Sequence, residues 1–282
     1  MDSLRSGLFA CFASALNCFM QTVSQTLAGH RSIRAFTPAT IPQAVIDEVL
    51  HEAITGTSSS GNLNSYAVVL TRDPQRRQRL YELHGEQDFI LQAPLLMTFC
   101  ADWYRVREWL RLRGARDNFG HLLGYHVAAF DAMLLSQSVS LAFEARGYGL
   151  CYLGTTLNAM PDISAFLELL DTCVPVTTMA VGVPAEDPSK RDRLPLAAYV
   201  HDERYQAPTQ DELAELYRDR EESGWARYMA TPALKAKCDE GAITSLAQFY
   251  TSPYKYDPDE QRAQSDRLLE FLTEKGFFPG NE

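Results

Sequence analysis

The chain has 282 residues, of which 46% are hydrophobic and 22% are charged, and these proportions are ordinary for a soluble globular protein with a full core. The formal net charge of −10 and the sequence pI near 5.1 argue against nonspecific binding to nucleic acid or to an anionic membrane, because phosphate-rich surfaces repel such a protein. A small anionic ligand is still allowed where positive charge gathers locally.

The spacing of the six cysteines does not indicate a disulfide framework, and the six histidines do not form a metal-binding pattern. The sequence contains no CxxC pair and no HExxH motif. We therefore expect a reducing, cytoplasmic environment and no metal site.

The N-terminus contains an apolar stretch, GLFACFASALNCFM, over residues 7–20. The segment before it carries both an acid and an arginine, and the stretch is shorter than the roughly 20 residues that span a bilayer, so it is a poor signal peptide or membrane anchor. We expect residues 1–19 to be an appendage outside the catalytic fold.

The first predicted helix covers residues 42–56, where apolar side chains recur at helical spacing. A small polar loop follows at 57–62, and the run YAVVLT at 66–71 indicates a strand. A second buried strand is predicted at 94–101. Charged, helix-like segments lie on either side of it, at 74–84 and 103–113.

The interval 121–146 is rich in Leu, Ala, Met and Phe, which indicates a long helix buried on nearly all sides, either central or at a subunit interface. The later predicted elements are strands at 149–153 and 174–183 and helices at 162–171, 210–220 and 258–275. Helices mixed with strands without regular alternation favour an α+β sandwich.

The glycine-rich segment Gly147-Tyr148-Gly149 suggests a nucleotide-binding fingerprint, but the match fails. The element runs from helix into strand, whereas the dinucleotide fingerprint needs a strand followed by a helix. No GxSxG elbow or Walker loop is present. Cys151 stands alone in an apolar strand, a setting in which a cysteine is more often buried than nucleophilic.

Two basic clusters remain, His30-Arg31-Ser32-Ile33-Arg34 and residues 190–195, which read KRDRLP. Guanidinium and imidazole groups beside a hydroxyl would suit a phosphate if the clusters converge, since charge-assisted hydrogen bonds are strongest there. The alternative is two solvated surface patches, and neither cluster alone names a function.

Taken together, six landmarks resemble the nitroreductase family, specifically its larger NADPH-using nitroreductase and flavin reductase group. They occur in the expected order over residues 20–205, as HRSIRAF, the Thr-Ser-Ser-Ser loop, GEQ, FCAD, YLGT and RDRLP. The resemblance implies a three-layer sandwich with a mixed, mainly antiparallel sheet, dimeric with a long interface helix. Residues 20–205 would form the FMN-binding domain and 206–282 a helical arm or lid.

In that family FMN lies at a homodimer interface, which implies roles for particular residues here. His30, Ser32, Arg191 and Arg193 would surround the phosphate, with Arg31 shaping the loop. Arg34 would lie near N1 and the C2 carbonyl of the isoalloxazine, where positive charge favours hydride acceptance. The other implied FMN contacts are Ser59 and Gln87, at the ribityl chain or pyrimidine edge, and Tyr152, Leu153 and Gly154, with the Gly154 amide facing N5.

The resemblance further implies an FMN-dependent oxidoreductase that takes hydride from NADPH or NADH and passes it by a ping-pong mechanism to small-molecule acceptors: nitroaromatics, quinones or free flavin. The cofactor carries the chemistry, so no protein nucleophile or metal is required. The alternatives are a dehalogenase-like or flavin-cleaving member of the same fold, and a flavin-binding sensor or storage protein without turnover.

Two departures from the family pattern bear on this reading. Thr155 and Thr156 stand where the family commonly repeats glycine, and they could narrow the pocket. Arg220 is the best candidate for the NADPH phosphate, but Glu221 and Glu222 beside it would repel a 2′-phosphate and leave the preference between NADPH and NADH open.

Overall fold

The computed structural model describes residues 20–278, so the expected appendage at residues 1–19 lies outside the described part of the chain. The described residues form two compact units. One runs to Ser189 and resumes at Leu268, and the other covers Lys190 to Arg267. This division differs from the boundary at residue 205 expected from the sequence, and the arm or lid from residue 206 remains a prediction.

The first unit is built on a four-stranded sheet in the order β1-β2-β4-β3, in which every pairing of neighbouring strands is antiparallel. The strands are β1 (Tyr66–Thr71), β2 (Leu95–Asp102), β3 (Gly149–Leu153) and β4 (Cys173–Gly182). All eight residues of β2 are buried, as expected for a central strand made of an unbroken apolar run. The four predicted strands are confirmed within a residue at each end.

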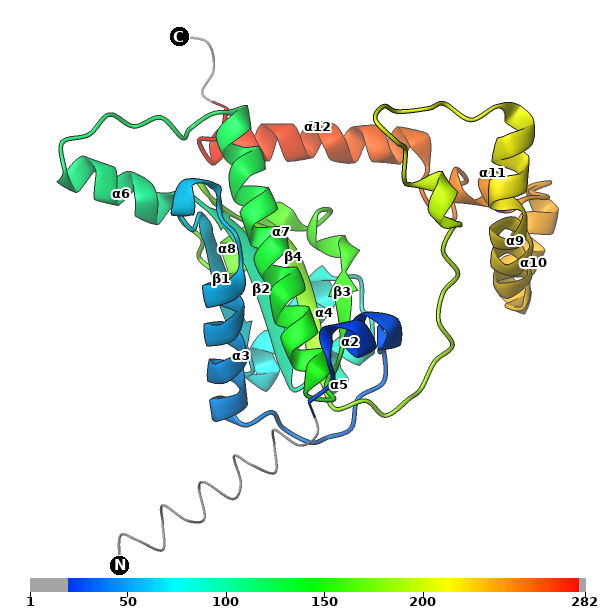
Figure 1. Ribbon diagram of the computed structural model, residues 1–282, viewed down its shortest axis with the longest axis horizontal. Coiled ribbons are helices and arrows are strands. Elements are labelled where there is room, and N and C mark those ends of the chain that lie inside the picture. Colours follow the sequence, from blue (N-terminus) through cyan, green and yellow to red (C-terminus); the bar gives the residue numbers. More distant parts are fainter. Residues whose placement is uncertain (1–19, 279–282) are drawn as a thin grey trace, which may run out of the picture. The chain divides into compact units, whose positions relative to one another are not determined.

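One face of the sheet is covered by α3 (Gln43–Gly56) and α7 (Leu122–Ala145), which lie side by side in Figure 1. Their apolar side chains pack on the residues of β2 that point to this face, among them Leu95, Met97 and Phe99. The other face is covered by α4 (Pro74–Leu83), α5 (Phe89–Gln92) and α8 (Met160–Phe166). The three-layer α+β architecture is therefore confirmed.

Helix α7 is long and apolar enough to cross a membrane by length and composition, and it alone passes that test among residues 20–278. Its inner side packs on the sheet through Ala132, Leu135 and Val139, so its composition is that of a core helix. Its outer side leaves large apolar residues exposed in the described chain, namely Phe130, Met133 and Leu134.

The remaining elements of the first unit are α2 (Val23–Gly29), α6 (Tyr104–Leu112), the short turns η1 (Ser60–Asn62) and η2 (Gly154–Thr156), and the end of α12 (Pro258–Glu274). The helix expected at 162–171 ends at Phe166, because Glu168 and Thr172 adopt left-handed backbone conformations that a helix cannot continue through.

The second unit contains η3 (Leu196–Ala198), α9 (Gln210–Met229), α10 (Pro232–Glu240), α11 (Leu246–Tyr250) and the beginning of α12. Helix α9 continues nine residues beyond the end predicted at 220. The reason is a small core of its own, in which Cys238, Leu246 and Phe249 pack against the second half of α9. Gly224 on α9 allows this approach, since a Cβ there would lie 2.6 Å from the Leu246 side chain.

Candidate functional site

The basic segment His30 to Phe36 runs as extended chain beside β3. The Ile33 amide donates to the Leu150 carbonyl at 2.9 Å, and Phe36 forms an isolated antiparallel bridge with Pro184. Gly149 is required by this close approach, since a Cβ on it would lie 2.6 Å from Cγ1 of Ile33. The glycine that suggested a nucleotide fingerprint therefore serves packing.

This arrangement brings the basic segment to the strand that ends in the predicted flavin turn. Ser32 and Arg34 both lie near the Cys151 thiol, which is 2% exposed. Burial raises the pKa of that thiol, and the positive charge of Arg34 and a hydrogen bond with Ser32 only partly oppose the effect. A thiol kept protonated is a poor nucleophile, so Cys151 is a packing residue here.

Carboxylates already hold His30, predicted to bind the phosphate, and Arg31, predicted to shape the loop. His30 Nδ1 lies 2.7 Å from a carboxylate oxygen of Glu144, and Arg31 forms an ion pair with Asp187. The Arg34 amide donates to the carboxylate of Glu186. The side chain of Arg34 forms no ion pair within the described residues, so its charge remains available to a ligand.

The turn after β3 faces open space at Gly154, where an added Cβ would meet nothing within 4 Å. Thr156 points inward, with its hydroxyl donating to the Leu153 carbonyl and accepting from the Thr178 amide. Thr156 therefore fixes the turn to the sheet and does not narrow the space in front of Gly154. Tyr152 points to the opposite face of β3, where its hydroxyl lies 3.3 Å from that of Ser136 on α7.

His84 also lies in this region and was not predicted from the sequence. It is fully buried, its Nδ1 lies 2.9 Å from the Thr155 hydroxyl, and burial lowers its pKa to about 4. Its Nε2 is buried without a partner in the described part of the chain. The Gln87 side chain donates to the His84 carbonyl at 2.9 Å, so Gln87 lies at the same turn. No sequence motif marks His84.

Ser59 lies at a different place. Its hydroxyl donates to Asp131 on α7 at 2.6 Å, and the buried Asp131 carboxylate also accepts from the Ser60 amide and the Ser65 hydroxyl. Asp131 and Glu144, the partner of His30, are 13 residues apart on α7, or about 20 Å at 1.5 Å per residue. Within one chain, His30 therefore lies at the C-terminal end of this helix, whereas Ser59 lies near its middle.

Arg191, Arg193 and Arg220 belong to the second unit. There Arg220 donates to the carbonyl of Asp192 and to the hydroxyl of Tyr250, both at 3.3 Å, so it lies against the RDRLP segment. The carboxylate of Glu221 accepts from the Leu246 amide at 2.6 Å. The expected convergence of Arg191 and Arg193 on the His30 cluster remains a prediction.

The fold and this cluster define a class of protein: an antiparallel sheet between two helical layers, with an extended basic segment lying against a strand that ends in an open glycine turn. The sequence profile described as the nitroreductase family matches residues 27–183. The chain belongs to the nitroreductase family. The expected family and fold, and with them the expectation of an oxidoreductase, are confirmed.

The chain is 31% identical over 196 residues to the FMN reductase (NADPH) of Bacillus subtilis, covering 68% of this chain and 78% of that protein. It is 29% identical over 260 residues to the FMN reductase [NAD(P)H] of the same organism, covering 92% and 98%. Its fold is similar to that of the NfrA1 nitroreductase of B. subtilis, with a TM-score of 0.76 at 24% identity over 92% of this chain and 100% of that one.

Proposed function

We propose that the protein is a cytoplasmic, homodimeric FMN-dependent oxidoreductase that takes hydride from NADPH or NADH and passes it by a ping-pong mechanism to nitroaromatics, quinones or free flavin. The observation that carries this proposal is the position of Ser32 and Arg34 beside Cys151 on β3, the strand that ends in the open turn at Gly154, in a chain of the nitroreductase family. Two relatives from B. subtilis bear the names of FMN reductases.

The residues present fit FMN. Arg34 carries a charge without a carboxylate partner in the described chain, and Arg31 has a buried Nε without a hydrogen-bond acceptor there. Gly154 leaves room for a planar ring, since nothing in the described structure occupies the space where its side chain would be. Bound FMN supplies the hydride-accepting and hydride-donating centre.

The protein's own work is then binding, orientation and electrostatics. Ser32 and the arginines would hold the phosphate, and Arg34 would place positive charge near the ring. Thr156 ties the Gly154 turn to β4, which keeps the backbone amide at that turn in a fixed position. His84 stays neutral near pH 7, because its pKa is about 4, and adds no second positive charge at the turn.

Homodimerisation is supported by α7. Its outer face exposes Phe130, Met133 and Leu134, and large apolar side chains side by side on a helix are typical of an interface. Because Ser59 and His30 contact α7 at points about 20 Å apart, both can serve one flavin if each comes from a different subunit. A twofold contact along α7 would supply such a site.

The test is the visible absorbance of the purified protein. We expect a yellow protein whose flavin band bleaches anaerobically when NADPH or NADH is added and returns when a quinone or nitroaromatic follows. A colourless protein that takes up no FMN would disprove the proposal. Bound FMN that neither nicotinamide reduces would instead favour the sensor or storage alternative.

A further inference from the structure

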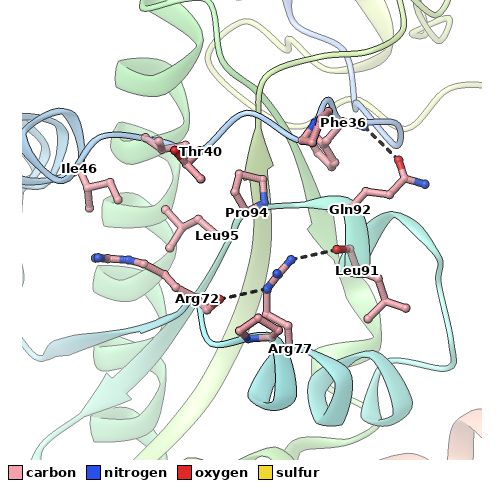
Figure 2. Close-up of a pocket in the computed structure, with 12 residues that line it drawn as sticks. Phe36, Thr40, Ile46, Arg72, Arg77, Leu91, Gln92, Pro94 and Leu95 are labelled. Carbon is pink, nitrogen blue, oxygen red and sulfur yellow. Dashed lines mark hydrogen bonds between the residues drawn. The ribbon is translucent and has the colours of Figure 1, made fainter.

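A separate pocket lies at the end of the sheet where β2 begins. It has a volume of about 580 Å³ and is shown in Figure 2. Its walls come from the segment after Phe36, from α3, from the start of α4 and from α5. None of the residues implied in flavin binding lines it. A volume of this size suits a small organic ligand.

The walls are mainly apolar. The apolar lining residues of the pocket include Phe36, Ile41, Ile46, Leu91, Pro94 and Leu95. No Asp or Glu is among the lining residues, although the chain as a whole carries a net charge of −10. The charged groups of the pocket are two guanidinium groups, from Arg72 and Arg77.

Arg77 is fixed in place by backbone carbonyls. Its Nε donates to the Arg72 carbonyl at 3.2 Å, and its Nη1 donates to the carbonyls of Leu91 and Ala93 at 2.9 and 2.6 Å. Figure 2 shows two of these bonds reaching the guanidinium from opposite sides. The Nη2 group has no hydrogen-bond partner among residues 20–278, so the two N–H donors of this nitrogen remain on a guanidinium that is held rigidly.

Arg72 adds a second positive charge at the rim. It donates through one nitrogen to the Gln43 side chain and has no ion-pair partner in the described structure. A cation that is held by carbonyls and lacks a carboxylate partner is strongly attractive to an anion, and its fixed geometry reduces the entropy lost on binding. The apolar walls then favour a ligand with a hydrophobic body.

We propose that this pocket binds a small carboxylate with an aryl or alkyl body, its carboxylate on the Nη2 group of Arg77 and its body against Phe36, Ile46 and Leu95. The site is distinct from the flavin site and independent of the function proposed for it. The two sites share one segment of chain, because Phe36 follows Arg34 by two residues and is tied to α5 through its amide, which donates to Gln92 Oε1 at 3.1 Å.

The probe is 4-fluorobenzoate, observed by ¹⁹F NMR on the FMN-loaded protein, with neutral 4-fluorobenzamide as the matched ligand. We expect a saturable shift for the benzoate and at least about tenfold weaker binding of the benzamide. The flavin absorbance spectrum is recorded in the same titration, since a ligand stacked on the isoalloxazine would perturb it. Pocket binding leaves that spectrum unchanged.

The variants are Leu91→Glu and Leu91→Gln. Leu91 is 38% exposed, and its carbonyl accepts a hydrogen bond from Arg77. A carboxylate at position 91 therefore lies within reach of the Nη2 group of Arg77 and competes with the ligand. We expect Leu91→Glu to weaken benzoate binding at least about tenfold and Leu91→Gln to weaken it less than about threefold. Both variants should keep the melting temperature and the rate of FMN reduction.

Three results would overturn the proposal: absence of saturable benzoate binding, equal binding of the benzamide, and equal binding by the two Leu91 variants. A flavin spectrum that changes with the same dissociation constant as the ¹⁹F signal would also overturn it, because the ligand would then lie on the flavin. Arg77→Lys is a second test, provided that its melting curve shows a folded protein. Lysine keeps the positive charge but lacks the planar guanidinium donors, so this variant should bind benzoate more weakly.

Discussion

The imidazole of His84 lies 2.9 Å from the hydroxyl of Thr155, which links the end of α4 to the turn that follows β3. His84 is fully buried and its pKa is lowered from 6.5 to about 4 by burial, so the folded protein binds this proton much less readily than the unfolded chain does. The link from α4 to the turn that contains Gly154 is therefore made by an imidazole that stays neutral near pH 7.

We expect His84 to make stability fall with acidity. Because its folded pKa lies below its unfolded value, its stabilising effect is complete above pH 6.5 and is lost as the pH falls from 6.5 towards 4. The full difference corresponds to about 3 kcal/mol. Urea unfolding of the wild type and of His84→Asn between pH 7.5 and pH 4.5 checks this, since asparagine can keep a hydrogen bond to Thr155 but does not titrate. The wild type should lose more stability than the variant, and parallel pH profiles would contradict the assignment.

Gly149 and Gly154 lie five residues apart and should respond oppositely to alanine. A Cβ at Gly149 would lie 2.6 Å from Ile33 and 2.8 Å from Pro184, so Gly149→Ala should push the basic segment off β3 and lower the free energy of unfolding by about 1–3 kcal/mol. Gly154→Ala meets open space and should leave stability within about 0.5 kcal/mol.

Gly154→Ala should nevertheless weaken FMN binding, because the methyl group would enter the space proposed for the ring. Unfolding by urea and FMN titration by fluorescence quenching separate the two effects. A Gly154→Ala protein with wild-type FMN affinity and reduction rate would show that the flavin does not lie at this turn.

The sequence predicted the sheet well because each strand is a short apolar run bounded by turn residues, as in Tyr66–Thr71. It failed where the chain is ordered by contacts distant in sequence. Helices α10 and α11 are short and depend on such contacts: Cys238 of α10 is buried in the core beside α9, and the Leu246 amide of α11 donates to the Glu221 carboxylate. A periodicity argument contains no information on such contacts.

The candidate site, too, was predicted from the sequence only in part. The HRSIRAF segment was found from its residues, but its position beside β3 depends on a hydrogen bond from Ile33 to Leu150, more than a hundred residues later. The carboxylate partners of His30 and Arg31 were not predicted, because single acids such as Glu144 carry no pattern. His84 was missed for the same reason, and only burial distinguishes it from a surface histidine.

Arg220 provides a test of the nicotinamide preference. If it holds the 2′-phosphate, Arg220→Ala should raise KM for NADPH by about tenfold and leave KM for NADH nearly unchanged. Glu222→Gln is the matched variant with the opposite expected effect. It removes a negative charge near Arg220 and should therefore lower KM for NADPH. Glu221 is unsuitable as a control because it also anchors α11.

Steady-state rates with both nicotinamides decide the matter. An equal rise in KM for NADPH and NADH in Arg220→Ala would mean that the residue acts through its bonds to Asp192 and Tyr250, which fix the RDRLP segment, and does not recognise the phosphate.

Arg34 should tune the flavin more than it retains it. Its guanidinium lies near Cys151 and is not paired with a carboxylate in the described chain, whereas Arg31 is paired with Asp187. Arg34→Ala should therefore slow anaerobic FMN reduction by about tenfold or more, equivalent to about 1.4 kcal/mol of barrier, and lower the flavin midpoint potential. The dissociation constant of FMN should rise less than about threefold.

Stopped-flow reduction, a redox titration and an FMN titration on the same preparation separate these effects. Arg34→Lys keeps the charge and should recover most of the reduction rate if electrostatics is the cause. If Arg34→Ala releases FMN while the fraction that stays bound is reduced at the wild-type rate, Arg34 is a phosphate or loop residue. In that case positive charge near the ring must come from another residue.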